Sequence, residues 1–130
     1  MFYSLALERE APYILVMESK GERAMTKKAT IPAAIKRHVM SAFTCCAACG
    51  TWDADECGHL ISEANGGAMV AENFVRLCGR CNRLQGRANV AFRAFAPYTE
   101  SRAETESRRA YWAKYCKAAA AGIAKPYRPL

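Results

Sequence analysis

The amino-acid sequence predicts a single α+β domain, and three observations support this fold class. The chain has 130 residues, 52% of them apolar, which is the size of one domain with a modest core. Short runs of strand-forming residues alternate with stretches of helical periodicity. Two cysteine pairs, each with a two-residue gap, flank the central runs. We therefore expect one small mixed fold over residues 1–130.

The N-terminal part is expected to form a hairpin, a polar connection and a helix. Two apolar stretches within residues 1–18 are separated by charged residues, which favours a β-hairpin. Residues 19–30 are polar, and Thr30 is suited to cap a helix over about 31–42, in which Pro32 is tolerated in the first turn. The apolar face of this helix repeats every four residues, at Ile31, Ile35, Val39 and Phe43.

The centre of the chain is expected to form two strands and a second helix. Residues 59–61 and 74–77 are short apolar runs that favour strands, and the segment 62–73 between them has the composition of a loop. From Gly79 the pattern becomes helical and continues to about Phe95, where Pro97 would stop it.

A final helix is expected over residues 99–121. The segment is rich in alanine, and Gly122 would end it. Its aromatic side chains could cover the rest of the domain or form the interface of a homodimer, and both readings stay open. These aromatic residues are Tyr111, Trp112 and Tyr115.

The charge of the chain favours a polyanionic partner such as DNA. The formal net charge is +7, and binding of basic side chains to phosphates releases counterions. The charge is uneven: residues 53–63 hold four acids and no lysine or arginine, whereas residues 76–93 hold five arginines and no acid. A DNA-binding face is therefore expected in the later part of the chain.

The sequence gives no sign of a membrane protein or a secreted protein. No window holds 18 uninterrupted apolar residues, so no membrane span is expected. Glu8, Arg9 and Glu10 interrupt the segment where a signal peptide would carry its apolar core. We therefore expect a cytoplasmic protein.

Four of the seven cysteines have the spacing of metal ligands. Cys46 and Cys49 form one knuckle and Cys78 and Cys81 a second, so that four thiolates can surround one structural Zn²⁺. The 28 residues between the knuckles exceed the length of a simple zinc ribbon and suggest a functional insert. Three cysteines remain: Cys45 is an alternative ligand that fits less well, Cys57 a core thiol or replacement ligand, and Cys116 a helix-packing residue.

The segment between and around the knuckles, CGHLISEANGGAMVAENFVRLCGRCNRLQG, resembles the HNH endonucleases of the ββα-metal (His-Me finger) superfamily. Those proteins carry a histidine on a first strand, an asparagine before a second strand and a third Asn or His on the next helix. Many also have CxxC knuckles on both sides of the hairpin. The matching residues are His59, Asn73 and Asn82, spaced by 14 and 9 residues. The resemblance implies a small ββα module with its core over about 31–95.

The resemblance also implies a role for each of these residues. His59 would be the general base that takes a proton from water, a task that suits an imidazole near neutral pH. Asn73 would fix the hairpin and help orient the imidazole through backbone contacts. Asn82 would give a side-chain oxygen to one catalytic Mg²⁺ or Mn²⁺. His38, by contrast, is expected to be structural or exposed.

One position departs from the family pattern. Many members have an aspartate immediately before the histidine, and here that position is Gly58, which has no side chain to bind a metal. The favoured interpretation is that Asn82 is the sole direct protein ligand, with water and DNA completing the shell. Alternatively Glu63 or Asp55 reaches the metal, or the site is catalytically weakened.

The functional expectation is a metal-dependent endonuclease that nicks or cuts DNA. The alternative is a zinc-stabilised DNA-binding module that keeps the scaffold without hydrolysis. The small size and the positive net charge of the chain fit phage, restriction or mobile-element proteins of a bacterial or phage-infected cell. Arginines at helical spacing would contact DNA phosphates. Basic residues of the final helix, such as Arg108 and Arg109, would extend this DNA-binding track. The arginines at helical spacing are Arg76, Arg80, Arg83 and Arg87.

Overall fold

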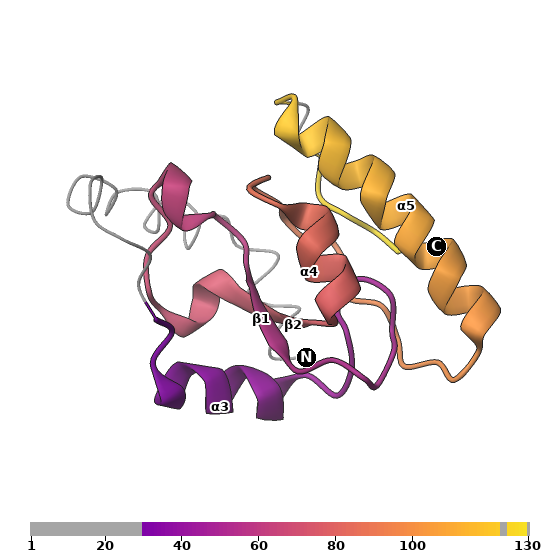
Figure 1. Ribbon diagram of the computed structural model, residues 1–130, viewed down its shortest axis with the longest axis horizontal. Coiled ribbons are helices and arrows are strands. Elements are labelled where there is room, and N and C mark those ends of the chain that lie inside the picture. Colours follow the sequence, from indigo (N-terminus) through magenta and orange to yellow (C-terminus); the bar gives the residue numbers. More distant parts are fainter. Residues whose placement is uncertain (1–29, 123–124, 130) are drawn as a thin grey trace.

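A computed structural model of the chain describes residues 30–122 and 125–129. Within these residues the fold is α+β, with three α-helices, two short 3₁₀ helices and one two-stranded antiparallel sheet (Figure 1). The hairpin expected within residues 1–18 lies outside the described residues. The helices and strands are α3 (Ala33–Ala42), β1 (Glu56–His59), β2 (Phe74–Leu77), α4 (Gly79–Gln85) and α5 (Arg102–Ala120).

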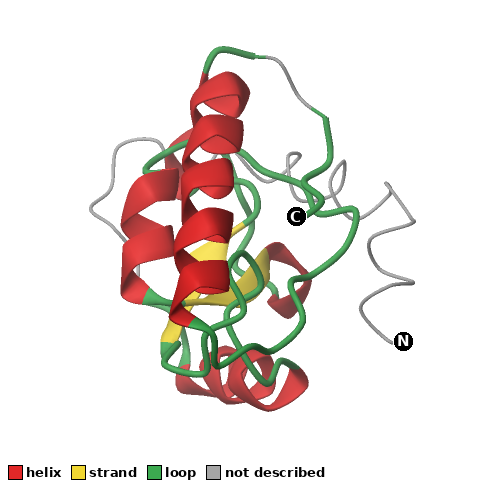
Figure 2. Cartoon of the chain, turned by 90° about the vertical axis from the view of Figure 1, so that its right-hand side faces the viewer, coloured by secondary structure: helices red, strands yellow, loops and turns green. Residues whose placement is uncertain are grey.

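The small sheet lies between two helices, and the third helix packs outside them. Helix α3 contacts both strands from one side and α4 contacts them from the other, while α5 packs against α4 (Figure 1). Figure 2 shows α4 and α5 running side by side across the strands. The described end of the chain returns to the core, where Tyr127 forms a parallel bridge with Phe92.

An aromatic cluster joins α5 and the C-terminal segment to the rest of the core. Trp112 stacks on Phe92 with ring centroids 5.4 Å apart, and it meets Tyr127 edge-on at 4.8 Å. All three side chains are buried. Trp112 and its neighbour Tyr115 therefore cover the rest of the domain, which is the first of the two roles that the sequence left open.

Helix α3 starts later than the sequence suggested. The expected cap at Thr30 was wrong, because Pro32 occupies the N-cap position with an extended backbone (φ −59°, ψ 144°). A proline disfavours helical geometry in the residue before it, so the helix cannot continue back through Ile31. The C-terminal bound at Ala42 agrees with the prediction.

The two strands differ in how well the sequence predicted them. Strand β2 occupies Phe74–Leu77 as expected, but β1 covers Glu56–His59 and not residues 59–61. The register pairs Glu56 with Leu77 and His59 with Phe74, so β1 matches the whole length of β2. Hydrogen bonding to β2 therefore overrides the weak strand preference of Glu56 and Gly58.

Helix α4 is much shorter than the expected span to Phe95. It ends at Gln85 because Gly86 adopts φ 59° and ψ −123°, a conformation that only glycine enters readily. Beyond it the backbone is extended, and alternate residues Ala88, Val90 and Phe92 are buried. The period of two in this segment indicates an extended chain and not the predicted helix.

Helix α5 is close to its expected span. Ser101 caps it by accepting a hydrogen bond from the Glu104 N–H at 3.2 Å. Gly122, which has φ 93°, follows its last turn as predicted. The structure contains, among its described residues, no helix that combines the length and apolar character needed to cross a membrane.

Candidate functional site

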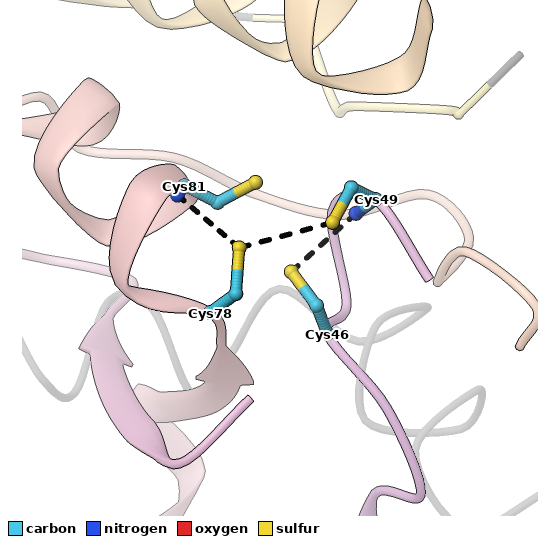
Figure 3. Close-up of side chains that lie close together, drawn as sticks. All are labelled: Cys46, Cys49, Cys78 and Cys81. Atoms are coloured by element: carbon cyan, nitrogen blue, oxygen red, sulfur yellow. Dashed lines mark hydrogen bonds between the residues drawn. The ribbon is translucent and has the colours of Figure 1, made fainter. Parts of the chain in front are cut away.

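The four cysteines of the two knuckles form one buried cluster. Cys46 and Cys49 lie in the turn after α3, Cys78 is the N-cap of α4, and Cys81 lies in its first turn. Their sulfur atoms all lie within 4.8 Å of one another. Figure 3 shows the four side chains converging on a common centre. The cluster could hold a metal ion such as zinc, as the cysteine spacing predicted.

The donor set and its spacing fit a tetrahedral zinc site. With Zn–S bonds of about 2.3 Å, adjacent sulfurs of a regular tetrahedron lie about 3.8 Å apart. The Sγ atoms of Cys49 and Cys78 are separated by 3.8 Å. Within each knuckle the N–H of the second cysteine donates to the sulfur of the first, at 3.4 Å in both cases. Such N–H···S bonds stabilise the thiolate form that a metal requires.

Hydrogen bonding within the cluster favours ionisation of two of the four thiols. The Cys46 side chain lowers the pKa of Cys49 to about 7 and lowers the pKa of Cys78 well below its usual range. Burial has the opposite effect on Cys46, whose pKa is raised. Since a metal binds thiolates, a cation at the centre would be needed to ionise the whole set.

The three other cysteines take no part in this cluster. The thiol of Cys45 donates to the carbonyl oxygen of Ala96 at 3.5 Å, so the residue next to the first knuckle is used in packing. Burial raises the pKa of Cys57, and it raises the pKa of Cys116 to about 12. All three are buried thiols that behave as small apolar side chains.

Helix α5 supplies a second layer of contacts around the knuckles. The Arg108 guanidinium donates to the carbonyl oxygens of Cys49 and Pro97, at 3.2 and 3.1 Å. The Trp112 indole N–H donates to the Cys81 carbonyl at 2.9 Å. Arg109 approaches the sulfur of Cys78 at 3.6 Å. Arg108 and Arg109 therefore contact the cysteine cluster, whereas the sequence had suggested that they extend a DNA-binding track.

The position of Arg109 leads to a prediction about metal retention. A four-thiolate zinc site carries a net negative charge, and a cation beside one sulfur should stabilise it. We expect Arg109→Met to lose zinc to a competing chromogenic chelator about tenfold faster than wild type. Arg102→Met, an exposed arginine at the start of the same helix, is the control and should release zinc at the wild-type rate. Equal rates for both variants would exclude this role.

The loop between the strands is held by Asn73. This side chain is 1% exposed, accepts a hydrogen bond from the Ile61 N–H at 2.8 Å and donates to the carbonyl oxygens of Ile61 and Ala68, both at 3.0 Å. A Cβ at Gly67 would overlap the Ile61 carbonyl, so the loop packs tightly here. Asn73 thus fixes the hairpin through backbone contacts, in the manner that the resemblance implied.

His59 is the last residue of β1 and is half-buried. Its ring packs on Phe74, its register partner on β2, with centroids 4.6 Å apart. The next peptide is held on both sides, because the Leu60 N–H donates to the Asn73 carbonyl at 2.7 Å and Gln85 of α4 donates to the His59 carbonyl at 2.7 Å. The backbone that carries the imidazole is therefore tied to the loop and to α4.

Removal of the Asn73 side chain should destabilise the fold strongly. Asn73→Ala would leave the N–H and carbonyl of Ile61 buried and without these partners, at a cost of about 3 kcal/mol. Asn65→Ala removes an exposed amide from the same loop and should cost less than about 1 kcal/mol. Urea unfolding of zinc-loaded protein measures both values, and a similar cost for the two variants would contradict the role of Asn73.

Asn82 faces a carboxylate that the sequence did not single out. Its side-chain amide donates to Oε1 of Glu56 on β1 at 2.9 Å. If Gly58 carried a Cβ, this atom would lie 3.3 Å from Asn82 Oδ1. Positions 56, 58 and 82 therefore lie close together. A Cβ at Gly58 would also overlap the buried side chain of Leu77. An aspartate at position 58, as in many HNH proteins, would require Leu77 to repack.

The four arginines proposed to bind DNA are not equivalent. The Arg76 guanidinium donates to the backbone carbonyls of Ala54, Met40 and Phe43, so it joins β2 to the end of α3. Arg80 and Arg83 are exposed on α4. Arg87 is also exposed, but it lies beyond the end of α4, so the shared helical face expected for Arg80, Arg83 and Arg87 does not include it.

Comparisons with protein-family models, curated proteins and solved structures found no match. The likeness to the HNH endonucleases therefore rests on the sequence motif and its spacing. The structure itself shows an antiparallel hairpin, a helix after it and a cysteine cluster.

Sequence reasoning missed three contacts around these sites: Glu56 with Asn82, Gln85 with His59, and Arg109 with Cys78. Only the first had a signal in the sequence. Residues two apart on a strand share a face, so Glu56 lies on the same face as Gly58, the position where the family carries its acid. Asp55 and Glu63, which we had considered as substitutes, do not have this relation to Gly58.

Proposed function

We propose that this chain is a metal-dependent endonuclease of the HNH type that hydrolyses phosphodiester bonds of DNA. The observation that carries the proposal is the combination of the motif His59, Asn73 and Asn82 with a ββα arrangement of β1, β2 and α4. Asn73 holds the loop next to His59, and Asn82 and Gln85 both bond from α4 to β1. These contacts support a preorganised site, which catalysis requires.

In the proposed reaction, a nitrogen of the His59 imidazole takes a proton from water, and the water oxygen forms a bond to phosphorus. The phosphorus–oxygen bond to the leaving sugar oxygen breaks at the same centre. A divalent Mg²⁺ or Mn²⁺ held at Asn82 would supply charge stabilisation for the phosphate and the leaving oxygen. The hydrogen-bonded backbone at His59 would help to orient the imidazole, whose ring packs at a tilt against Phe74.

Substrate binding is proposed to use the exposed arginines of α4. Arg80 and Arg83 lie on the helix that also carries Asn82, and Arg87 follows two residues after its end. Phosphate contacts from these side chains would hold the DNA backbone at the site without reading its sequence. The net charge of +7 supports the same kind of partner. Arg76 is left out of this set because its guanidinium is bonded to backbone carbonyls.

A second candidate function is DNA binding without hydrolysis. It is favoured by Gly58 and by the buried Leu77 side chain, which occupies the space that an acid at position 58 would need. A scaffold that has lost a metal ligand could still bind DNA through its arginines and its zinc-stabilised core.

Cleavage of supercoiled plasmid DNA across a series of Mg²⁺, Mn²⁺ and Ni²⁺ concentrations separates the two functions. The proposed enzyme gives nicked or linear plasmid only when a divalent metal is present, and Asn82→Ala should reduce the rate strongly. Intact plasmid at every metal concentration, together with salt-dependent binding in a gel shift, would favour the binding module. Salt-insensitive or absent binding would contradict both.

A further inference from the structure

The contact between Glu56 and Asn82 carries a further inference, which rests on the proposed function. We propose that the Glu56 carboxylate is the acidic ligand of the divalent-cation site, together with the side-chain oxygen of Asn82. It would replace the acid that the chain lacks at Gly58. The carboxylate lies 2.9 Å from the Asn82 amide nitrogen, and the two residues come from the two elements, β1 and α4, that form the site.

The spacing of the two side chains suits a small hard cation. Rotation of the Asn82 amide by half a turn exchanges its oxygen and nitrogen, which have nearly the same size. The exchange would put two oxygens 2.9 Å apart. Adjacent ligands of an octahedral Mg²⁺ with bonds of about 2.1 Å are separated by about 3 Å. In the arrangement seen, the hydrogen bond keeps the two side chains at the separation that a shared cation would impose after this rotation, when the cation would replace the N–H as the link between them.

The charge of the Glu56 carboxylate is available to a cation. Its side chain is half-buried, and no ion pair joins it to any described residue. Arg83 is a base in the same region: its NH1 atom and the second oxygen of Glu56 lie 3.2 and 3.1 Å from the position of a Cβ at Gly79. A Cβ at Gly79 would be in tight contact with both groups, so the absence of a side chain at this position lets the carboxylate and the guanidinium lie where they do.

The packing explains why the acid is at position 56 and not at 58. The two positions share one face of β1, and the space in front of Gly58 is occupied by Leu77. Glutamate has one more methylene group than aspartate. The carboxylate at position 56 can therefore extend beyond the Leu77 side chain to Asn82 on α4. Its contact with Asn82 is the result.

The test is Mn²⁺ binding to the zinc-loaded protein, measured from the electron paramagnetic resonance signal of free Mn²⁺. We expect Glu56→Gln to weaken Mn²⁺ binding by at least about tenfold, because it removes the only charge among the proposed ligands. Gln keeps an oxygen that can accept the Asn82 hydrogen bond, so a residue that only positions Asn82 would leave Mn²⁺ binding unchanged. Asp53→Asn is the matched control, since this nearby acid is exposed and should not affect binding.

The outcomes separate this inference from the proposed function. Unchanged binding by Glu56→Gln, or wild-type protein that binds no Mn²⁺ at millimolar concentration, would overturn the role of Glu56. Mn²⁺ binding that depends on Glu56 in a protein that cuts no DNA would keep the cation site and reject the endonuclease. Zinc content and the circular dichroism spectrum show that each variant is folded. If Glu56→Gln does not fold, Glu56→Asp, which shortens the side chain, should also weaken binding, and wild-type affinity there would overturn the proposal.

Discussion

Replacement of one knuckle cysteine, Cys46→Ser, is expected to abolish cooperative folding of the described domain. The apparent free energy of a structural zinc site is about 10–16 kcal/mol in small zinc-binding peptides. A domain of this size has a total stability of only about 5–15 kcal/mol. The cluster also joins segments far apart in the chain, and all four cysteines lie in the hydrophobic core. Zinc content by elemental analysis and thermal melting by circular dichroism measure the effect.

Cys45→Ser is the matched control for this experiment. Cys45 is adjacent to Cys46 in the chain and is also buried, but its side chain bonds to the Ala96 carbonyl, an interaction that a serine hydroxyl can replace. We expect one zinc per chain and a melting temperature close to that of wild type. If Cys46→Ser retains one zinc and melts like the control, the four-cysteine site is not what stabilises the fold.

The second large effect is expected from His59→Ala, which should reduce the rate of DNA cleavage by about 10²–10⁴-fold. The variant removes the proposed general base, while the backbone contacts of His59 to Gln85 remain. DNA affinity should stay within about twofold of wild type, because the proposed phosphate contacts come from arginines. Single-turnover nicking of a supercoiled plasmid measures the rate, and a gel shift measures the affinity.

The chain offers a natural control for this variant. It contains two histidines, and His38 lies exposed on α3, a different element from the hairpin. His38→Ala should cleave DNA at the wild-type rate. Cleavage by His59→Ala at an undiminished rate would remove His59 from the mechanism and would leave the DNA-binding module as the better reading of the site.

The sequence predicted the parts of the fold that depend on short-range signals. The thiols of Cys46, Cys49, Cys78 and Cys81 meet as their spacing indicated. Strand β2 coincides with its apolar run, and α5 is followed by Gly122 as expected, both of which are local signals. Each knuckle, strand and helix end is encoded within a few residues of where it appears, and the matched spacing of the two knuckles indicated that they would meet.

Other features depend on contacts between distant residues and could not be predicted in the same way. The length of α4 was wrong because Gly86 and the alternating residues after it were read as helical, whereas the Val90 N–H bonds to the distant Leu60 carbonyl. The partnership of Glu56 with Asn82 joins residues 26 apart in the chain. Arg108 and Arg109 looked like surface charges until the packing of α5 put them against the knuckles.

The indole contact at the second knuckle has a practical consequence for spectroscopy. The chain contains two tryptophans: Trp52 is 65% exposed and Trp112 is fully buried, with its N–H bonded to the Cys81 carbonyl. A Trp52→Phe variant would retain a single tryptophan, whose emission depends on the polarity around the ring. Its N–H is bonded to the backbone of a proposed zinc ligand. The protein thus carries an optical probe of its own metal loading, with no added label.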